Sequence, residues 1–500
     1  MSDWTAGYVA ECGYTYGYYP ELNPLATQLA FAHAGLPLPV VSTACELGFG
    51  QGLSVNIHAA ASGTRWFGND FIPAQAAFAQ QLAAISGAAA QLTDQSFADF
   101  TRRSDLPDFD FIAMHGIWSW VSAENRAIII DFVRRKLKPG GVLYMSYNAL
   151  PGWSAFAPMR QLMSEHARRA AAAGDGIVQR IDAAVDFAGA LLATDPLYLR
   201  SNPAVLNHFR QVAGQARPYL AHEYFNRDWA PMYFAEVADL LAPAGLSFAC
   251  SASYFEHIDA LNMTAEQQAF LLRIEDARLR ESSRDYMLNQ RFRRDYWIKG
   301  EAPPREPGWS EALARQRVML IVPRAEVPPR IVGSRGGLDM DPAVYGPLLD
   351  ALATQQPCSL GELAERLQPQ GVTRAQLLQA LIILCGMQQI ASVQDAVLAA
   401  AARPCCQALN AWLIEQATHS EDLGHLLSPL TGGGIAVSRL HQVFLQALPA
   451  TESPADLAGH ARQVLGEARD LAGDQDELSA RARIFVERHL PVLRALQVVP

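Results

Sequence analysis

One stretch of this sequence, residues 40–52, restricts the possible folds more than any other: VVSTACELGFGQG. An apolar run is followed by Glu46 and then by three glycines two positions apart, Gly48, Gly50 and Gly52. The apolar run predicts a buried strand of a parallel sheet. Glycines suit the turn from such a strand into a helix, because the backbone turns tightly there and approaches a ligand where a Cβ would intrude. The pattern therefore predicts an open α/β sheet with a nucleotide site at the carboxyl end of this strand.

The spacing of these glycines distinguishes two groups of nucleotide-binding proteins. Dinucleotide-binding domains carry G-x-G-x-x-G, whereas this chain has E-x-G-x-G-x-G. The second spacing resembles the first motif of the Rossmann-like methyltransferases, which use S-adenosylmethionine. A glycine-rich loop in another kind of α/β domain is the alternative at this point.

The composition excludes several classes of protein. The 500 residues carry 40 basic and 50 acidic side chains, a net charge of −10, which argues against a general nucleic-acid or membrane-surface binder. The seven cysteines form no CxxC pair, and no metal-ligand spacing is present, which favours reduced thiols in a cytoplasmic protein without a metal. Residues 1–24 have neither a basic nor an apolar signal-peptide region, and we expect an arm over the sheet or a lid over a pocket.

The second predicted strand, RWFGNDF, ends at Asp70 and Phe71. Asp70 lies 18 positions after Gly52, close to the spacing of about 20 residues at which an acid follows the glycine loop in nucleotide-binding sheets. Its carboxylate is expected to accept hydrogen bonds from both ribose hydroxyls of a nucleoside. The alternative role is the N-cap of the helix PAQAAFAQQLAAIS, and one residue can do both.

The next two predicted strands also end in polar or aromatic residues. After the third strand, Asp94, Ser96 and Phe97 are placed to meet an adenine amine and to cover the base, although Phe97 is equally suited to the core. After the fourth strand, FDFIAM, His115 and Gly116 are expected beside the first strand, at the switch point of the sheet. A structural role for His115 remains the alternative.

The rest of the catalytic half is predicted to supply the remaining strands of the sheet, with helical segments between them. A Pro-Gly-Gly turn precedes a fifth strand at 142–146, and a sixth strand follows at 247–252. Alanine-rich residues 155–215 and arginine-rich residues 256–300 have helical periodicity and are expected to interrupt the sheet. The segment RVMLIVPR, at 317–324, is predicted to be the seventh strand, antiparallel to the others.

The C-terminal half is predicted to be mostly helical. Two helices open with capping boxes, at Ser359 and at Thr373, and a short strand follows at 389–393. Three short helices and a strand resemble a winged helix. The helix TRAQLLQALIILCGMQ has one arginine and a broad apolar stripe, so we expect it to pack against protein and not to read DNA. The last hundred residues are helical, with a break at three consecutive glycines.

Four further motifs carry a resemblance to a known family: YTYGYYPELNP, HGIWSWV, SYNALPGW and YLAHEYFN. With the glycine loop they resemble the bacterial S-adenosylmethionine-dependent methyltransferases that carry a methyltransferase regulatory domain. The rickettsial protein-lysine methyltransferases, which act on outer-membrane proteins, belong to that family. The likeness covers the catalytic half, to about residue 300, more firmly than the remainder.

The resemblance implies an α/β fold: a Rossmann-like seven-stranded methyltransferase sheet with helical insertions, a winged-helix-like module and a C-terminal helical region. It implies S-adenosylmethionine as the cofactor. The expected cofactor residues are Glu46, Gly48, Gly50, Gly52, Asp70, Phe71, Asp94, Ser96, Phe97, His115 and Gly116. The expected divisions are an arm with the cofactor-binding core (1–154), helical insertions, regulatory region and closing strands (155–324), a linker (325–337), the winged-helix-like module (338–400) and the terminal helices (401–500).

The chemistry of methyl transfer predicts an acceptor site lined by aromatic side chains. An acceptor lysine must lose its proton, and burial in an apolar channel lowers its pKa, while aromatic faces hold a methylated ammonium by cation–π attraction. The predicted substrate-binding residues are Tyr16, Tyr18, Tyr19, Trp118, Asn148 and Tyr224, and the predicted catalytic residues are Tyr147, His222 and Glu223. For each of them, plain core packing is the alternative.

The sequence thus predicts a cytoplasmic enzyme that methylates lysine side chains of a protein by in-line transfer. Its expected partners are a protein substrate, with a cell-envelope protein as one candidate, and a second copy of the chain in a homodimer. A small-molecule methyltransferase of the same fold is the first alternative and would show a closed, narrow pocket beneath the N-terminal arm. A non-catalytic regulator that binds the cofactor is the second.

Overall fold

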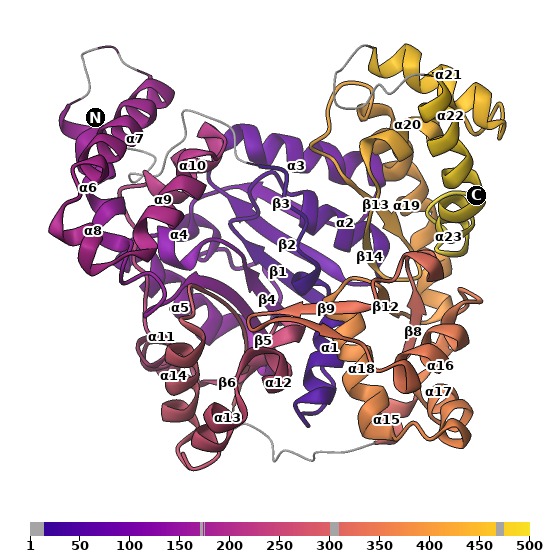
Figure 1. Ribbon diagram of the computed structural model, residues 1–500, viewed down its shortest axis with the longest axis horizontal. Coiled ribbons are helices and arrows are strands. Elements are labelled where there is room, and N and C mark those ends of the chain that lie inside the picture. Colours follow the sequence, from indigo (N-terminus) through magenta and orange to yellow (C-terminus); the bar gives the residue numbers. More distant parts are fainter. Residues whose placement is uncertain (1–14, 171–173, 175, 301–309, 467–474) are drawn as a thin grey trace.

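The computed structural model describes residues 15–170, 174, 176–300, 310–466 and 475–500. At its centre lies a seven-stranded sheet with helices on both faces (Figure 1). Its strands are β1 (Thr43–Leu47), β2 (Arg65–Asp70), β3 (Gln91–Asp94), β4 (Phe109–Met114), β5 (Leu137–Asn148), β6 (Leu246–Ser251) and β7 (Phe292–Lys299). They lie in the order β3-β2-β1-β4-β5-β7-β6. The predicted Rossmann-like sheet is confirmed, and β1 and β4 meet where the strand order reverses.

The seventh strand is not the one that the sequence predicted. The segment Phe292–Lys299 was expected to be helical, but it forms β7, which pairs antiparallel with both β5 and β6. The segment 317–324 was expected in this place, but its strand β8 (Arg317–Leu320) belongs to a separate three-stranded sheet. The charges of RFRRDYWIK suggested a solvated helical face. Arg293 and Asp295 are instead buried, because they pair with each other inside the fold.

A buried ionic network joins β5, β7 and helix α14 (Ala277–Leu288). The Arg293 guanidinium lies 2.9 Å from the Asp295 carboxylate and 2.6 Å from that of Asp285. Tyr147 donates a hydrogen bond of 2.8 Å to Asp295. Burial raises the pKa of Asp295 to about 6 and that of Asp285 to about 7. The pairing explains how a central strand accommodates charged residues.

Two apolar layers cover the sheet. One face packs on α1 (Pro24–His33), α2 (Leu53–Ala61) and α3 (Pro73–Ser86), and the other on α5 (Ala123–Lys136) and α11 (Phe234–Leu241). Side chains along β5 alternate between the two faces of the sheet. Tyr144 therefore packs in the first layer and Tyr147 in the second. This alternation decides which side chains of β5 can reach the nucleotide crevice.

A helical insertion with its own core stands beside the carboxyl ends of the strands. It comprises α6 (Ala157–Arg169), α7 (Ile177–Ala193), α8 (Leu197–Ser201), α9 (Ala204–Ala213) and α10 (Arg217–Tyr224). The helical interpretation of 155–215 is thus confirmed for the described residues. The insertion lies at the opposite end of the molecule from the C-terminal helices (Figure 1).

Beyond β7 the chain builds two further units. The first contains α16 (Pro342–Leu352), α17 (Leu360–Leu367), α18 (Arg374–Gly386), and the small sheet of β8, β11 (Cys358–Ser359) and β12 (Ile390–Val393). Both capping boxes are present, at Ser359 and Thr373. The predicted linker contains a hairpin of β9 (Arg330–Gly333) and β10 (Gly336–Asp339), where Gly336 has a φ of +106° that permits the turn. The winged-helix assignment stays a prediction.

The second unit packs on helices α2 and α3, which cover one face of the central sheet. Its long helix α19 (Ala396–Gln416) is apolar enough in length and composition to cross a membrane, yet it packs against α2 and α3. The hairpin of β13 (His425–Ser428) and β14 (Gly433–Ala436) forms at the three glycines. The remaining helices of the described chain are α4 (Phe97–Phe100), α12 (Asp259–Asn262), α13 (Ala265–Leu271), α15 (Glu311–Ala314), α20 (Arg439–Ala447), α21 (Pro454–Leu465), α22 (Gln475–Ile484) and α23 (Leu490–Ala495).

Candidate active site

The glycine loop leaves β1 and enters α2 with a backbone that requires glycine. Gly48, Gly50 and Gly52 have φ angles of +69°, +59° and +68°, in the left-handed region that side chains disfavour. A Cβ on Gly52 would also lie 2.4 Å from the Cβ of Ala79, on α3. Gly52 therefore allows close helix packing, whereas Gly48 and Gly50 line a cavity in front of the loop.

Asp70, at the end of β2, is bound to the glycine loop. Its Oδ2 accepts a hydrogen bond from the Gly50 amide at 2.8 Å, and its Oδ1 accepts one from the Ile72 amide at 2.9 Å. Burial raises its pKa to about 6. Each carboxylate oxygen has a second lone pair, so the held carboxylate can still accept hydrogen bonds from a ligand's hydroxyls.

The cavity in front of the loop has a volume of about 180 Å³. Of the predicted cofactor residues it is lined by Gly48, Gly50, Asp70, Phe71, Ser96, Phe97, His115 and Gly116. Three others lie outside the lining: Glu46 is buried beneath the loop, Gly52 packs on α3, and Asp94 is exposed. The Ser96 hydroxyl accepts from the Asp99 amide and donates to its carboxylate, so it caps α4.

Several lining residues were missed by the sequence interpretation. The apolar side chains of Ile72, Ile117 and Val121 give the cavity a slot suited to an aromatic base. Asn125 and Asp228 supply polar edges. Ile72 directly follows the predicted site residue Phe71, and Ile117 directly follows Gly116. Their positions in the sequence could therefore have indicated that they line the cavity. Asp228 follows the helical insertion, and no local pattern connects it to the loop.

His115 forms a wall of this cavity together with the N-terminal arm. The Tyr19 ring stacks on the imidazole with a centroid distance of 3.6 Å. The Tyr144 hydroxyl lies 2.7 Å from the His115 Nδ1. Burial, with a smaller contribution from Arg294, lowers the pKa of His115 to about 3. The imidazole is therefore neutral at physiological pH and is a poor proton acceptor there.

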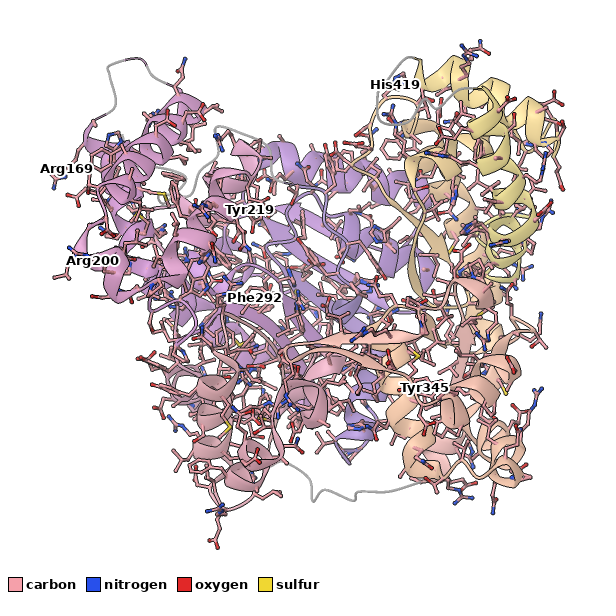
Figure 2. All side chains as sticks on the ribbon, viewed as in Figure 1. Arg169, Arg200, Tyr219, Phe292, Tyr345 and His419 are labelled. Atoms are coloured by element: carbon pink, nitrogen blue, oxygen red, sulfur yellow. The ribbon has the colours of Figure 1, made fainter. Side chains whose placement is uncertain are left out.

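A second cavity, of about 420 Å³, adjoins the first. The two share His115, Gly116 and Trp120 as lining residues. Of the predicted acceptor-site residues, Asn148, Glu223 and Tyr224 line the second cavity. It is also lined by residues not predicted, among them Trp153, His208, Tyr219, Arg291 and Phe292. Figure 2 labels two of its lining residues, Tyr219 on the helical insertion and Phe292 at the start of β7.

The structure places the other predicted acceptor-site residues elsewhere. Tyr16 packs edge-on against Phe78, on α3. Tyr18 accepts a hydrogen bond from the Gly434 amide at 2.8 Å. Trp118, Tyr147 and His222 are buried and line neither cavity. Tyr19 is placed beside the cofactor cavity by its contact with His115. Aromatic composition alone did not separate these core positions from cavity walls.

Tyr147 shows how this correction can be tested. The Tyr147→Phe substitution removes one hydrogen bond to the Asp295 carboxylate and is expected to lower the free energy of unfolding by about 1.5–3 kcal/mol. The rate of catalysis should remain close to wild type, because the hydroxyl does not reach either cavity. Denaturant unfolding and steady-state kinetics measure the two effects. A large loss in kcat with unchanged stability would restore the catalytic role.

Two family models match the part of the chain that carries these cavities. A methyltransferase domain matches residues 45–145, and a predicted methyltransferase regulatory domain matches residues 216–299. An uncharacterised protein of Synechocystis is 35% identical over 508 aligned residues, which cover 99% of each chain. The chain belongs to this family of S-adenosylmethionine-dependent methyltransferases. The first match runs from within β1 to within β5, and the second contains Glu223, Asp228 and all of β7.

Rickettsial proteins are also similar to this methyltransferase. The structure of PKMT2 from Rickettsia typhi in complex with AdoHcy superposes with a TM-score of 0.67 and 17% identity, covering 97% of this chain and 99% of that one. The likeness shows that the two share a fold over nearly their whole length. An uncharacterised protein of Rickettsia prowazekii is 30% identical over 130 residues, which are 25% of this chain and 49% of that protein.

The cofactor cavity has a second acid below it that fits the cofactor's cationic amino group. Within the described residues, Oε2 of buried Glu46 has no hydrogen-bond partner. Burial, and to a smaller extent the charge of Asp70, raises the pKa of Glu46 to about 8. A nearby ammonium favours the ionised carboxylate, so the residues present fit S-adenosylmethionine.

This fit predicts that cofactor binding depends on pH. Below pH 8 Glu46 must release its proton when the cationic cofactor binds, so the affinity should rise with pH and level off near 8. Between about pH 6, the pKa of Asp70, and pH 8 the slope should come from Glu46. Titration calorimetry over this range measures it. The Glu46→Gln variant should bind more weakly and without this slope; a slope unchanged in that variant would contradict the assignment.

Proposed function

We propose that this methyltransferase transfers the methyl group of S-adenosylmethionine to a lysine side chain of a protein. The observation that carries the proposal is the second cavity, which adjoins the cofactor cavity and shares His115, Gly116 and Trp120 with it as lining residues. It combines aromatic rings with one carboxylate, Glu223, a lining suited to an amine. We call it the acceptor cavity.

The cofactor cavity accounts for the donor side of the reaction. Asp70 can bind the ribose hydroxyls, and the slot near Ile72, Phe97 and Ile117 can hold the adenine. Bound S-adenosylmethionine supplies an electrophilic methyl group on a sulfonium. Gly116 lines both cavities with a φ of +64°, and a Cβ at this residue would have no heavy atom within 4 Å, so no side chain fills the space beside it.

The acceptor cavity accounts for the amine. The rings of Trp120, Trp153, Tyr219 and Tyr224 line it, and burial among such rings lowers the pKa of a lysine amine. The uncharged amine attacks the methyl carbon while the carbon–sulfur bond breaks, which yields a methylated amine and S-adenosylhomocysteine. The ammonium proton passes to Glu223 and then to solvent. The neutral His115 excludes water and does not take this proton.

Radiolabel transfer tests the acceptor class. The full-length protein is incubated with methyl-labelled S-adenosylmethionine and a cell lysate, and the protein fraction is separated from small molecules. The proposal predicts label in lysine-containing protein. Label confined to small molecules would contradict it and would favour the small-molecule alternative. An Asp70→Ala control, which lacks the ribose contact, should add much less label to either fraction than the wild type at a cofactor concentration well below its Kd.

A further inference from the structure

A third cavity lies where three parts of the chain meet, and its described lining shares no residue with the cofactor or acceptor cavity. Its volume is about 150 Å³, close to the 180 Å³ of the cofactor cavity. Residues of the N-terminal arm and α1, of the small sheet around β12, and of the β13–β14 hairpin line it. These elements lie on the side of the sheet opposite the helical insertion (Figure 1).

The lining of this cavity indicates the chemistry of its ligand. Its described lining residues include no aspartate, glutamate, lysine or arginine, unlike those of the cofactor and acceptor cavities. Most of the surface is aliphatic, with Ile321, Ile390 and Ile435 among the lining residues. Among the described residues the side chains of Ser392 and His425 make no hydrogen bond to one another or to a third residue, so both can bind a ligand. Burial lowers the pKa of His425, which is therefore neutral.

The cavity is connected to the active site through two adjacent residues of the arm. Tyr18 lines the cavity, and its ring lies 4.8 Å from that of His425. Its hydroxyl accepts from the Gly434 amide and keeps its own proton for another partner. The next residue, Tyr19, stacks on His115 at the cofactor cavity. A ligand that holds Tyr18 would therefore also restrain a wall of the active site.

We propose that this cavity is an effector site for a small, uncharged and mostly apolar ring compound with a hydrogen-bonding edge. Its occupant contacts the isoleucines on its apolar faces and Ser392, His425 or Tyr18 at its edge. By restraining the arm it tightens cofactor binding. Because the two affinities are linked, the cofactor must tighten binding of the effector by the same factor. The proposal concerns a site distinct from the acceptor cavity, and it does not depend on which acceptor is methylated.

Methyl NMR of the full-length protein tests the site directly. Indole is titrated as the probe, with indole-3-acetate and tryptamine as its charged counterparts. The Cδ1 resonances of Ile321, Ile390 and Ile435 should shift with indole and much less with the charged compounds. Those of Ile112 and Ile129, buried in the core across the sheet, should not. Absence of shifts up to the solubility limit of indole, or equal shifts with all three compounds, would overturn the proposal.

Two variants and one linkage measurement complete the test. Ser392→Phe should fill the cavity and abolish the shifts, whereas Ser392→Ala should retain them; the unchanged Ile112 and Ile129 resonances report that each variant is folded. Saturating indole should lower the Kd for S-adenosylmethionine about fivefold or more, the usual lower limit of allosteric coupling. Shifts that survive Ser392→Phe would overturn the site, and an unchanged Kd would overturn its effector role.

Discussion

The Asp70→Ala variant is expected to bind S-adenosylmethionine about 100-fold more weakly than the wild type. The carboxylate is held by the Gly50 and Ile72 amides at one edge of the cofactor cavity. Hydrogen bonds to a charged group contribute about 1.5–3 kcal/mol each, and two ribose hydroxyls are lost together. Since about 1.4 kcal/mol corresponds to a factor of ten, the loss reaches two orders of magnitude. Titration calorimetry gives the Kd.

A matched control for this variant lies on the neighbouring strand. Asp94 pairs in register with Asp70 but is exposed and does not line the cavity. Asp94→Asn should therefore bind the cofactor with nearly wild-type affinity, although the sequence placed both acids in the site. Equal losses of cofactor affinity in the two variants would show that the affinity depends on the local negative charge and not on the position of Asp70. A wild-type Kd for Asp70→Ala would contradict the ribose assignment.

The Glu223→Gln variant is expected to lose about 100-fold in kcat/KM for a lysine acceptor while its cofactor Kd stays unchanged. Glu223 lines the acceptor cavity and not the cofactor cavity. An acid–base group of this kind contributes about 10²–10⁴-fold. The deficit should shrink as the pH approaches about 10.4, the unperturbed pKa of lysine, because the amine then loses its proton without help. Initial rates measured against pH give this profile.

A surface acid provides the control for Glu223. Glu236 accepts a hydrogen bond from the Tyr233 amide at the start of α11 and lines neither cavity. Glu236→Gln should retain wild-type kcat/KM. If Glu223→Gln lost activity equally at every pH, the carboxylate would position the substrate and would not take the proton. Loss of cofactor affinity in this variant would contradict the separation of the two cavities.

Most residues predicted for the donor side meet at one cavity, because the sequence information for them is local. The glycine loop, Asp70 and His115 each follow a strand that an apolar run marks, and parallel strands bring their carboxyl ends to one edge. The structure places Gly48, Gly50, Asp70 and His115 around one cavity. Asp94 was placed there by the same reasoning, but its side chain is exposed and does not line the cavity, although Ser96 and Phe97 after it do.

The acceptor side could not be predicted from local patterns. Its lining comes from the loop after β4, from α10 and from the segment before β7, which are far apart in the sequence. The prediction of β7 failed because hydropathy assigns charged residues such as Arg293 and Asp295 to the surface. In the fold these two side chains are buried and form an ion pair with each other. Tyr147 and Trp118 satisfied the aromatic pattern equally well, but both lie in the core.

Tandem mass spectrometry of the methylated product identifies the acceptor atom. The labelled protein from the lysate reaction is digested, and the position of the transferred methyl group is read from the fragment ions. We expect methyl groups on lysine Nε atoms, with much lower occupancy when the Glu223→Gln variant replaces the wild type at neutral pH. Methyl groups found only on carboxylates, thiols or main-chain termini, or a lysine yield that Glu223→Gln leaves unchanged, would contradict this expectation.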